Sequence, residues 1–253
     1  MRRVLLVFTA IVANFTICHS QEQRPYQEPF FGDEWSKPSE HPDRIVVNFG
    51  EDPATTASVT WRTAPIIYEA IAEIAIASGA PAKTSTFDAS AIDTAKVVAN
   101  YHSATFNDLQ PNTTYAYRVG DGNRWSEWIQ FKTASDNPEG SFSFLYVVDT
   151  QNFILELWSR LIREGYKTAP DASFIIHAGD LVNNAHREQE WEEWFIAGGW
   201  IHSSLPSFPV PGNHEYRPLN EEKRANKVRS LSAQWKPQFT LPEYGPEGLK
   251  ESV

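Results

Sequence analysis

The sequence predicts a two-part fold, in which a β-sandwich is followed by an α/β unit with a parallel sheet. Apolar and polar residues alternate with a period of two through residues 40–134, as in strands that bury one face. Beyond residue 141, short apolar runs alternate with segments of helical spacing. That order is typical of parallel strands joined by right-handed helical crossovers. A chain of 253 residues is long enough for these two domains.

A signal peptide is predicted for residues 1–20. Arg2 and Arg3 form its charged start, the apolar run from Val4 to Val12 forms its centre, and small residues precede Gln21 at the cleavage point. The apolar run is too short to span a bilayer. A buried N-terminal strand is the alternative interpretation. We therefore expect an exported protein (secreted, periplasmic or in the cell envelope) without a membrane span.

Cys18 is the only cysteine in the chain. It allows a lipoprotein interpretation, but Ile17 is bulky where a lipid-attachment site has a small residue. Cleavage after Ser20 leaves a mature chain without cysteine, which must rely on its core because it has no disulfides. The net charge of −10 argues against non-specific binding to nucleic acid or to anionic membranes. We therefore expect no nucleic-acid partner.

The first domain begins after a polar, proline-bearing segment, residues 21–39, that is predicted to be an extended lead-in. The alternating pattern predicts strands over residues 45–49, 57–62, 68–77, 101–106 and 128–133. Residues 68–77 are apolar enough for a helix, but the flanking strand pattern favours a strand. The segment around Tyr115 resembles the tyrosine corner of fibronectin-type-III-like sandwiches. Residues 134–140 are then the linker.

In the second domain, strands are predicted over residues 143–148, 174–178 and 208–211. Continuous apolar runs of this length suit strands that are buried on both faces of a parallel sheet. Residues with helical spacing follow the first strand, and Gly165 is expected to stop that helix. Trp191, Trp194 and Phe195 mark a second amphipathic helix.

The other histidines of this domain are not interpreted as metal ligands. His177 lies within the second predicted strand and is interpreted as a satisfied core histidine rather than a ligand. His186 and His202 are expected in exposed loops, and either could line a cleft. From Glu221 to Val253 the chain is polar and predicts no further strand.

Each predicted parallel strand ends in side chains that can bind a metal ion. In chain order, these candidates are Asp149, Gln151, Asp180, Asn183, Asn213 and His214. Ligands of parallel sheets sit at the carboxyl ends of the strands, so these side chains should lie at one edge. Carboxylate, amide and imidazole donors suit hard or borderline divalent metals. The alternative role for each aspartate is a helix N-cap, which strand-to-helix loops often carry.

The order of these motifs resembles that of the calcineurin-like metallophosphoesterases. The residues that carry the resemblance are Asp149, Gly179-Asp180 and Gly212-Asn213-His214-Glu215. Upstream, the N-terminal domain of purple acid phosphatases is similar at Asp52-Pro53-Ala54, Trp61-Arg62-Thr63 and Trp125-Ser126-Glu127-Trp128. The resemblance identifies residues 40–134 as that N-terminal domain and residues 141–253 as a metallophosphoesterase domain. It implies an acid phosphatase-like hydrolase that acts on small phosphate esters, with monoesters favoured.

The resemblance also implies roles for the candidate residues. The family binds two metal ions, here iron, zinc or manganese, and uses a metal-bound hydroxide to attack the phosphate. Asp180 would bridge the two ions, Asp149 would bind the first and Asn213 the second. His214 would lie beside the phosphate, as a general acid to the leaving group or as a stabiliser of transition-state charge.

Two of the candidates depart from the family pattern. Gln151 stands where most of the wider family has a histidine, and Asn183 stands where purple acid phosphatases have a tyrosine. Without that tyrosine, no tyrosinate–iron colour is expected. Gln151 or Asn183 can replace the lost ligand only weakly, through an amide oxygen. The identity of the metal pair therefore stays open.

The family supplies further metal-binding histidines from later motifs, including a Gly-His-x-His. Residues 215–253 contain no histidine. We therefore expect an incomplete catalytic domain, the first half of the α/β sandwich, and little turnover by the 253-residue chain alone. Two alternatives stay open, namely a phosphodiesterase of the same family and a catalytically inactive exported binding module. The oligomeric state also stays open.

Overall fold

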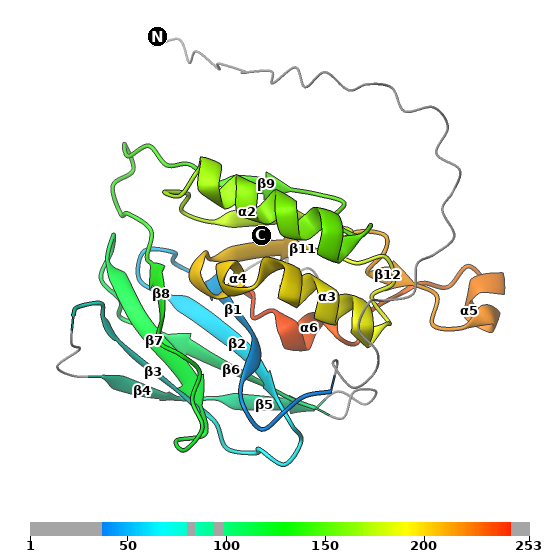
Figure 1. Ribbon diagram of the computed structural model, residues 1–253, viewed down its shortest axis with the longest axis horizontal. Helices are drawn as coiled ribbons and strands as arrows, with labels where there is room; N and C mark the ends of the chain where they lie inside the picture. Colours follow the sequence, from blue (N-terminus) through cyan, green and yellow to red (C-terminus); the bar gives the residue numbers. More distant parts are fainter. Residues whose placement is uncertain (1–36, 80–83, 94–98, 244–253) are drawn as a thin grey trace, which may run out of the picture.

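The computed structural model describes residues 37–79, 84–93 and 99–243 (Figure 1). The predicted signal peptide, residues 1–20, and most of the predicted lead-in lie outside the described residues. An N-terminal β-sandwich packs against an α/β part, and both helices and strands of the α/β part contact the sandwich (Figure 1). No helix within the described ranges is long and apolar enough to cross a membrane.

The N-terminal part consists of two four-stranded antiparallel sheets, which confirms the predicted fold class. One sheet has the order β1-β2-β6-β5 and the other the order β4-β3-β7-β8. The strands are β1 (Asp43–Phe49), β2 (Ala57–Thr63), β3 (Ile71–Ile76), β4 (Ser85–Asp88), β5 (Ser90–Asp93), β6 (Asn100–Phe106), β7 (Thr114–Gly120) and β8 (Ile129–Lys132). Trp61, Phe106 and Tyr117 are fully buried. The residues that alternate in the sequence thus point alternately into the core and towards solvent.

Two details of the sandwich were predicted from the sequence and are confirmed. The Tyr115 hydroxyl accepts a hydrogen bond from the Gln110 backbone N–H at 2.7 Å, which is the tyrosine-corner contact. The Tyr115 ring also stacks on Phe131, with the ring centroids 6.1 Å apart. The apolar segment within residues 68–77 forms strand β3 and not a helix.

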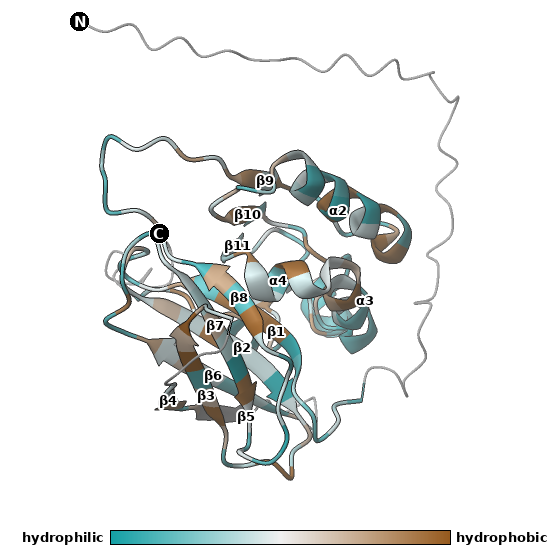
Figure 2. Cartoon of the chain, turned by 60° about the vertical axis from the view of Figure 1, so that its left-hand side comes forward, coloured by the Kyte–Doolittle hydropathy of each residue, from teal (hydrophilic) through white to brown (hydrophobic). Residues whose placement is uncertain are grey.

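The α/β part is built on a three-stranded parallel sheet with the order β11-β10-β9. Its strands are β9 (Leu145–Val147), β10 (Ile175–Ala178) and β11 (Ser207–Val210). The helical elements are a π-helical turn η1 (Ile154–Trp158), α2 (Ser159–Thr168), α3 (Glu188–Gly198) and α4 (Trp200–Ser204). Their apolar side chains, among them Trp158 and Trp194, pack in one cluster with Ile175 of the sheet. Figure 2 shows these helices on one side of the three strands.

Two predictions about this sheet are wrong for the described residues. The strands are not buried on both faces, because the helices cover only one of them and Tyr146 of β9 is 63% exposed on the other. Gly165 does not end α2, which continues to Thr168. A Cβ at Gly165 would lie 3.7 Å from the Leu145 side chain of β9. That distance is an ordinary van der Waals contact, so Gly165 lies within the helix where it faces the strand.

The prediction of no strand after Glu221 is also wrong. The last elements are β12 (Tyr216–Arg217), α5 (Glu221–Ala225), β13 (Ser230–Leu231) and α6 (Trp235–Gln238), and β12 pairs antiparallel with β13. Two-residue strands are too short to show a period in the sequence. Trp235 and Phe239 are 2% and 4% exposed and pack on Trp191 of α3. These two aromatic residues hold the segment against the core.

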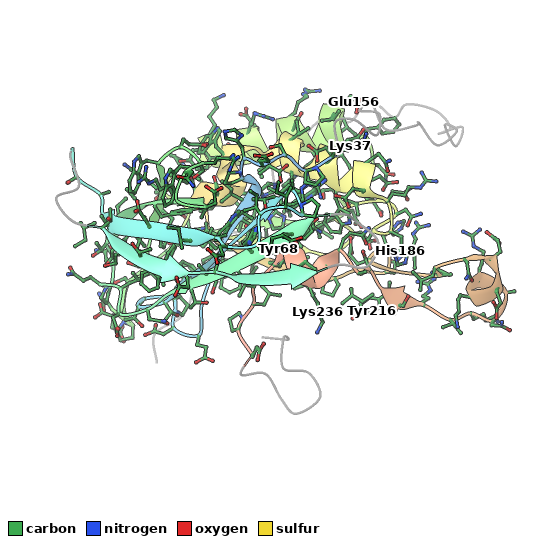
Figure 3. All side chains as sticks on the ribbon, turned by 90° about the horizontal axis from the view of Figure 1, so that it is seen from below. Lys37, Tyr68, Glu156, His186, Tyr216 and Lys236 are labelled. Atoms are coloured by element: carbon green, nitrogen blue, oxygen red, sulfur yellow. The ribbon has the colours of Figure 1, made fainter. Side chains whose placement is uncertain are left out.

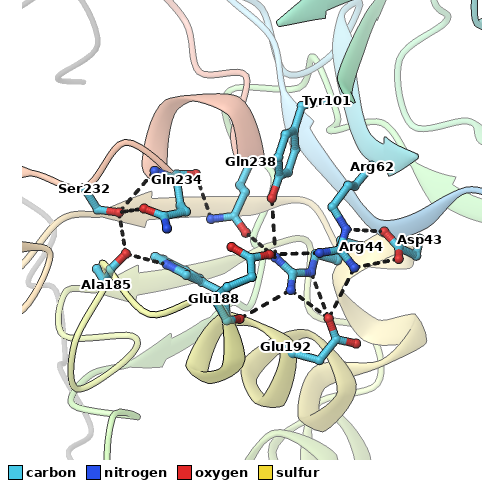
Figure 4. A network of polar contacts seen from close by, with 11 residues as sticks. Asp43, Arg44, Arg62, Tyr101, Ala185, Glu188, Glu192, Ser232, Gln234 and Gln238 are labelled. Carbon is cyan, nitrogen blue, oxygen red and sulfur yellow. Dashed lines mark hydrogen bonds and ion pairs between the residues drawn. The ribbon is translucent and has the colours of Figure 1, made fainter. Parts of the chain in front are cut away.

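Buried ion pairs join the sandwich to the α/β part (Figure 4). Arg44 of β1 lies 2.6 Å from the Glu188 carboxylate and 2.7 Å from that of Glu192, both on α3. Arg62 of β2 pairs with Asp43 at 2.7 Å and with Glu188 at 2.9 Å. The side chains of the two arginines are 2% and 0% exposed, so loss of one partner leaves a buried charge unpaired. The α/β part is therefore fixed on the sandwich.

Buried histidines stand in the cores of both parts. His177 of β10 is a core residue, as predicted, and is 1% exposed. His202 was expected in an exposed loop, but it lies in α4, is 1% exposed, and stacks on Trp194 with 4.0 Å between the ring centroids. The cause is the short helix α4, which the sequence pattern did not predict. Burial lowers the pKa of His202 to about 4 and the pKa of His102, in the sandwich, also to about 4. The pKa of His177 is lowered by burial and by the neighbouring His202.

Stability is therefore expected to fall on acidification. A histidine whose folded pKa is about 4 and whose unfolded pKa is near 6.5 stabilises the fold fully above pH 6.5, and this contribution is lost as the pH falls towards 4. For His202 the loss is roughly 3 kcal/mol over that window, at about 1.36 kcal/mol per pH unit. His202→Phe keeps an aromatic ring and removes the titration. The free energy of unfolding, measured with urea at several pH values between pH 7 and pH 4.5, should fall less steeply with decreasing pH in His202→Phe than in wild type. An equal dependence on pH in the two proteins would contradict this explanation.

Candidate functional site

The loops after the three parallel strands meet at the carboxyl edge of the sheet. β10 pairs with Val147 of β9 through His177, and with Val210 of β11 through Ala178. The residues just after each strand are therefore level with one another. The Asp149 N–H accordingly donates to the Gly179 carbonyl at 3.3 Å. The prediction that these loops share one edge is confirmed.

Asp149 and Asp180 share an unusual backbone conformation. Their φ angles are 54° and 53°, in the left-handed region that residues other than glycine, asparagine and aspartate rarely adopt. Such strained residues concentrate at functional sites, where the surrounding structure holds them in place. The Asp149 side chain is exposed, whereas Asp180 is 9% exposed. One carboxylate thus faces solvent at the sheet edge and the other is largely enclosed.

Two glycines let the second and third loops approach each other. Gly179 has a φ of 90°, and a Cβ on it would lie 2.9 Å from the Gly212 Cα. A Cβ on Gly212 would lie 2.3 Å from Asp180 Oδ1. Real Cβ atoms do not approach other atoms so closely, so both positions require glycine. The glycines of the two motifs are therefore explained by the close approach of Asp180 to the loop that carries His214.

Glu215 joins these loops, a role that the sequence analysis did not assign. The residue is fully buried. Its Oε2 accepts from the N–H groups of Asp180 at 2.9 Å and Gly212 at 2.7 Å. Its Oε1 accepts from Leu181 at 2.9 Å and from Val182 at 3.5 Å. Burial raises the pKa of Glu215, and these four donors oppose that shift. The signal for this role was its place as the last residue of the Gly-Asn-His-Glu motif.

His214 is bonded to both neighbouring motifs. Its backbone N–H donates to Asp180 Oδ1 at 2.8 Å. Its ring Nδ1 lies 2.6 Å from the Asn183 carbonyl oxygen. The guanidinium of Arg217 also contacts the ring, at Nδ1 and at 3.4 Å from Nε2. The imidazole is thus oriented by the backbone of the second loop and by Arg217.

The amide candidates differ in what their oxygens contact. Asn183 Oδ1 accepts from Arg217 Nη2 at 3.2 Å, so this oxygen is already engaged. Gln151 Oε1 is buried without a hydrogen-bond partner among the described residues. Asn213 is exposed. Of the two residues that depart from the family pattern, Gln151 therefore has the more available donor oxygen.

The donor chemistry of this edge fits a metal ion in part. Two carboxylates and an unpartnered amide oxygen match the preference of divalent cations for oxygen ligands. Within the part of the chain that the structure describes, however, no group of three or more His, Cys, Asp or Glu side chains could hold a metal ion. The described residues thus offer an oxygen-rich half-site, and two ions would require further ligands.

Family models and curated relatives match both parts of the chain. Residues 42–133 match the model of the purple acid phosphatase N-terminal domain, and residues 107–247 match that of the calcineurin-like phosphoesterases. Acid phosphatase type 7 of Danio rerio is 28% identical over 117 residues, and that of Homo sapiens is 26% identical over 118 residues. Each alignment covers 46% of this chain and 26% of the relative. The chain thus spans about a quarter of the length of these relatives.

Solved structures show the same fold at low identity. A purple acid phosphatase from yellow lupin (Lupinus luteus) seeds superposes with a TM-score of 0.61 and 18% identity, over 70% of this chain and 36% of that chain. PhoD superposes with a TM-score of 0.50 and 15% identity, over 71% of this chain and 41% of that chain. Both likenesses extend over the sandwich and the α/β part, since neither part alone makes up 70% of the chain.

Proposed function

The chain belongs to the calcineurin-like phosphoesterase family, and from that membership we propose that it is a metal-dependent hydrolase of phosphoric esters. The observation that carries the proposal is the bonding of His214 to Asp180, whose carboxylate accepts the His214 N–H at 2.8 Å. Glu215 holds the loops of both residues through backbone N–H groups. A carboxylate suited to metal ions and an imidazole suited to a substrate are thereby preorganised at one sheet edge.

The proposed metal ligands are Asp149, Asp180 and Asn213, with Asp180 as the bridge between two ions of iron, zinc or manganese. Gln151 is a proposed weak ligand of the first ion, because its Oε1 has no hydrogen-bond partner among the described residues. Asn183 is a poorer candidate, since its oxygen accepts from Arg217. When bound, such ions neutralise phosphoryl charge and activate the attacking water. Two four-coordinate ions need more donors than these, so the proposal requires ligands from outside the described residues.

His214 is the proposed catalytic residue. The Asn183 carbonyl oxygen lies 2.6 Å from Nδ1, and the proposal assigns Nε2 the role of acting on the substrate. Protonated at Nε2, the ring can donate its proton to the leaving-group oxygen or stabilise the charge that develops there. The neighbouring Arg217 guanidinium adds a fixed positive charge beside the phosphoryl group.

The substrate and the location of the protein follow as further parts of the proposal. The curated relatives are acid phosphatases, which favours a small phosphate monoester over a diester. The acidic chain, with its net charge of −10, does not preclude such a substrate, because bound cations invert the local field. Export through the predicted signal peptide, residues 1–20, would place the enzyme outside the cytoplasm.

The His214→Ala variant tests the proposed function, in a protein that includes the further metal ligands that two ions require. We expect it to keep bound metal and to lose about 10²–10⁴ in rate, the range of general acid–base groups. The loss should be larger on an alkyl phosphate than on p-nitrophenyl phosphate, because p-nitrophenolate leaves without protonation. Rates on both esters, measured at high protein concentration to detect slow turnover, are compared with metal content. His41→Ala, an exposed histidine of the sandwich, is the matched control.

Two outcomes would count against this role of His214. Loss of metal in His214→Ala would make the residue a ligand and not a general acid. An equal loss of rate on both esters would show that the ring does not protonate the leaving group. A wild-type chain that hydrolyses neither ester and binds no metal would favour the non-catalytic binding module.

A further inference from the structure

A basic arm extends from the candidate site. We define it as residues 216–231, from β12 through α5 to β13. It contains five basic residues and two acidic ones, a net charge of +3, in a chain whose net charge is −10. The basic residues are Arg217, Lys223, Arg224, Lys227 and Arg229. Figure 1 shows α5 projecting beyond the body of the protein, and Figure 3 shows the side chains of this arm spread around it.

Both ends of the arm are fixed to the candidate site. β12 begins directly after Glu215, and Arg217 in it contacts the His214 ring and Asn183 Oδ1. Antiparallel pairing of Arg217 with Ser230 returns the chain to the same place. The next residue but one, Ser232, donates its N–H to the Glu215 carbonyl at 2.9 Å. The arm is thus an extension of the loop that carries the proposed catalytic histidine.

The positive charges of the arm are poorly neutralised. All residues from 221 to 229 are exposed. Arg224 and Glu221 form an exposed pair at 3.6 Å, which contributes little, and Lys227 and Arg229 have no acidic partner among the described residues. A second anion near these exposed cations would relieve their mutual repulsion.

From this arrangement we propose that the basic arm binds a second anionic group of the substrate. Phosphate esters that carry another phosphate or a carboxylate would then be preferred over esters of neutral alcohols. The inference deepens the proposed function and rests on it, because the first phosphoryl group is taken to bind beside His214. It gives Arg217 contact with the ester phosphate and gives Arg224 and Arg229 contact with the second anion.

The test is a pair of non-hydrolysable probes that differ by one charge. Binding of phenylphosphonate and of 4-phosphonobenzoate, which adds a carboxylate, is measured by calorimetry on the full chain with Mn²⁺ present. We expect the carboxylate to tighten binding about three- to tenfold at low salt, since exposed ionic contacts each contribute up to about fivefold. The ratio of the two affinities should fall to near one in R224Q/R229Q. It should also fall with added salt, because exposed charges are screened.

A matched double variant separates this effect from net charge. K132Q/K167Q removes the same charge from the end of β8 and the C-terminal end of α2, where both lysines are exposed, and should keep the ratio. A wild-type ratio near one, or an equal drop in both double variants, would overturn the role of the arm. If neither probe binds, the proposed function fails and the inference falls with it. If only 4-phosphonobenzoate binds, and Asp180→Asn leaves that binding unchanged, the arm stands as an anion site while the proposed function fails.

Discussion

Asp180→Asn is expected to remove metal binding from the chain. The change keeps the size of the side chain and leaves an oxygen that can accept the His214 N–H, which Asp180 Oδ1 now accepts at 2.8 Å. It removes the negative charge that lets two cations lie close together, where their repulsion is strong. Loss of residues that merely support ligands costs about 10–100-fold in metal affinity, so loss of the bridging carboxylate should cost at least about 100-fold. Calorimetric titration with Mn²⁺ or Zn²⁺ measures this change.

Asp171→Asn is the matched control for that variant. Asp171 is exposed and precedes β10, at the opposite end of the strand from Asp180. The same loss of charge there should leave metal affinity within about twofold, because an exposed charge that far from the site is screened by solvent and salt. Equal metal affinity in wild type and Asp180→Asn would show that this carboxylate is not a ligand. A similar loss of metal affinity in both variants would show that the change in net charge alone causes the effect.

Glu215→Ala is expected to have the second large effect, on stability. The variant leaves four N–H donors of Asp180, Leu181, Val182 and Gly212 without the carboxylate that they now bind. Each buried unsatisfied group costs about 1–3 kcal/mol, less where water enters, so the free energy of unfolding should fall by about 3–5 kcal/mol. Urea unfolding followed by far-ultraviolet circular dichroism measures the loss.

Amide exchange shows whether Glu215 acts locally or on the whole fold. In Glu215→Ala, the Leu181 and Val182 amides should exchange much faster than amides of the sandwich strand β2, because the two loops would open without unfolding the sandwich. Glu156→Ala, on the exposed surface of η1, is a control that should change neither stability nor exchange. An unfolding free energy within about 0.5 kcal/mol of wild type in Glu215→Ala would contradict the proposed role of Glu215.

The sequence predicted the parts of the fold that depend on repeated patterns. Alternating residues such as Trp61 in β2 predicted the sandwich, because each strand buries one face. Three apolar runs with intervening helical spacing predicted the parallel sheet, and the strand ends brought Asp149, Asp180 and His214 to one edge. Their roles as ligands and as general acid stay predictions.

Features that depend on tertiary contact could not be predicted. The burial of His202 follows from a short helix that has no sequence signature and is fixed by stacking on Trp194. The two-residue strand β13 is defined by its pairing with β12, which directly follows Glu215 in the chain. The engagement of the Asn183 oxygen by Arg217 joins residues that are 34 positions apart, so the sequence alone left Asn183 and Gln151 as equal candidates.

The central claim is that the strand ends form a metal-dependent phosphoester site. It is tested most directly by anomalous diffraction from crystals of the chain soaked with Mn²⁺ and phosphate. The account predicts an anomalous peak at bonding distance, about 2.0–2.2 Å, from carboxylate oxygens of Asp149 and Asp180, with the phosphate beside His214. A fully occupied Mn²⁺ site elsewhere on the chain, or no peak at this edge at saturating metal, would contradict it.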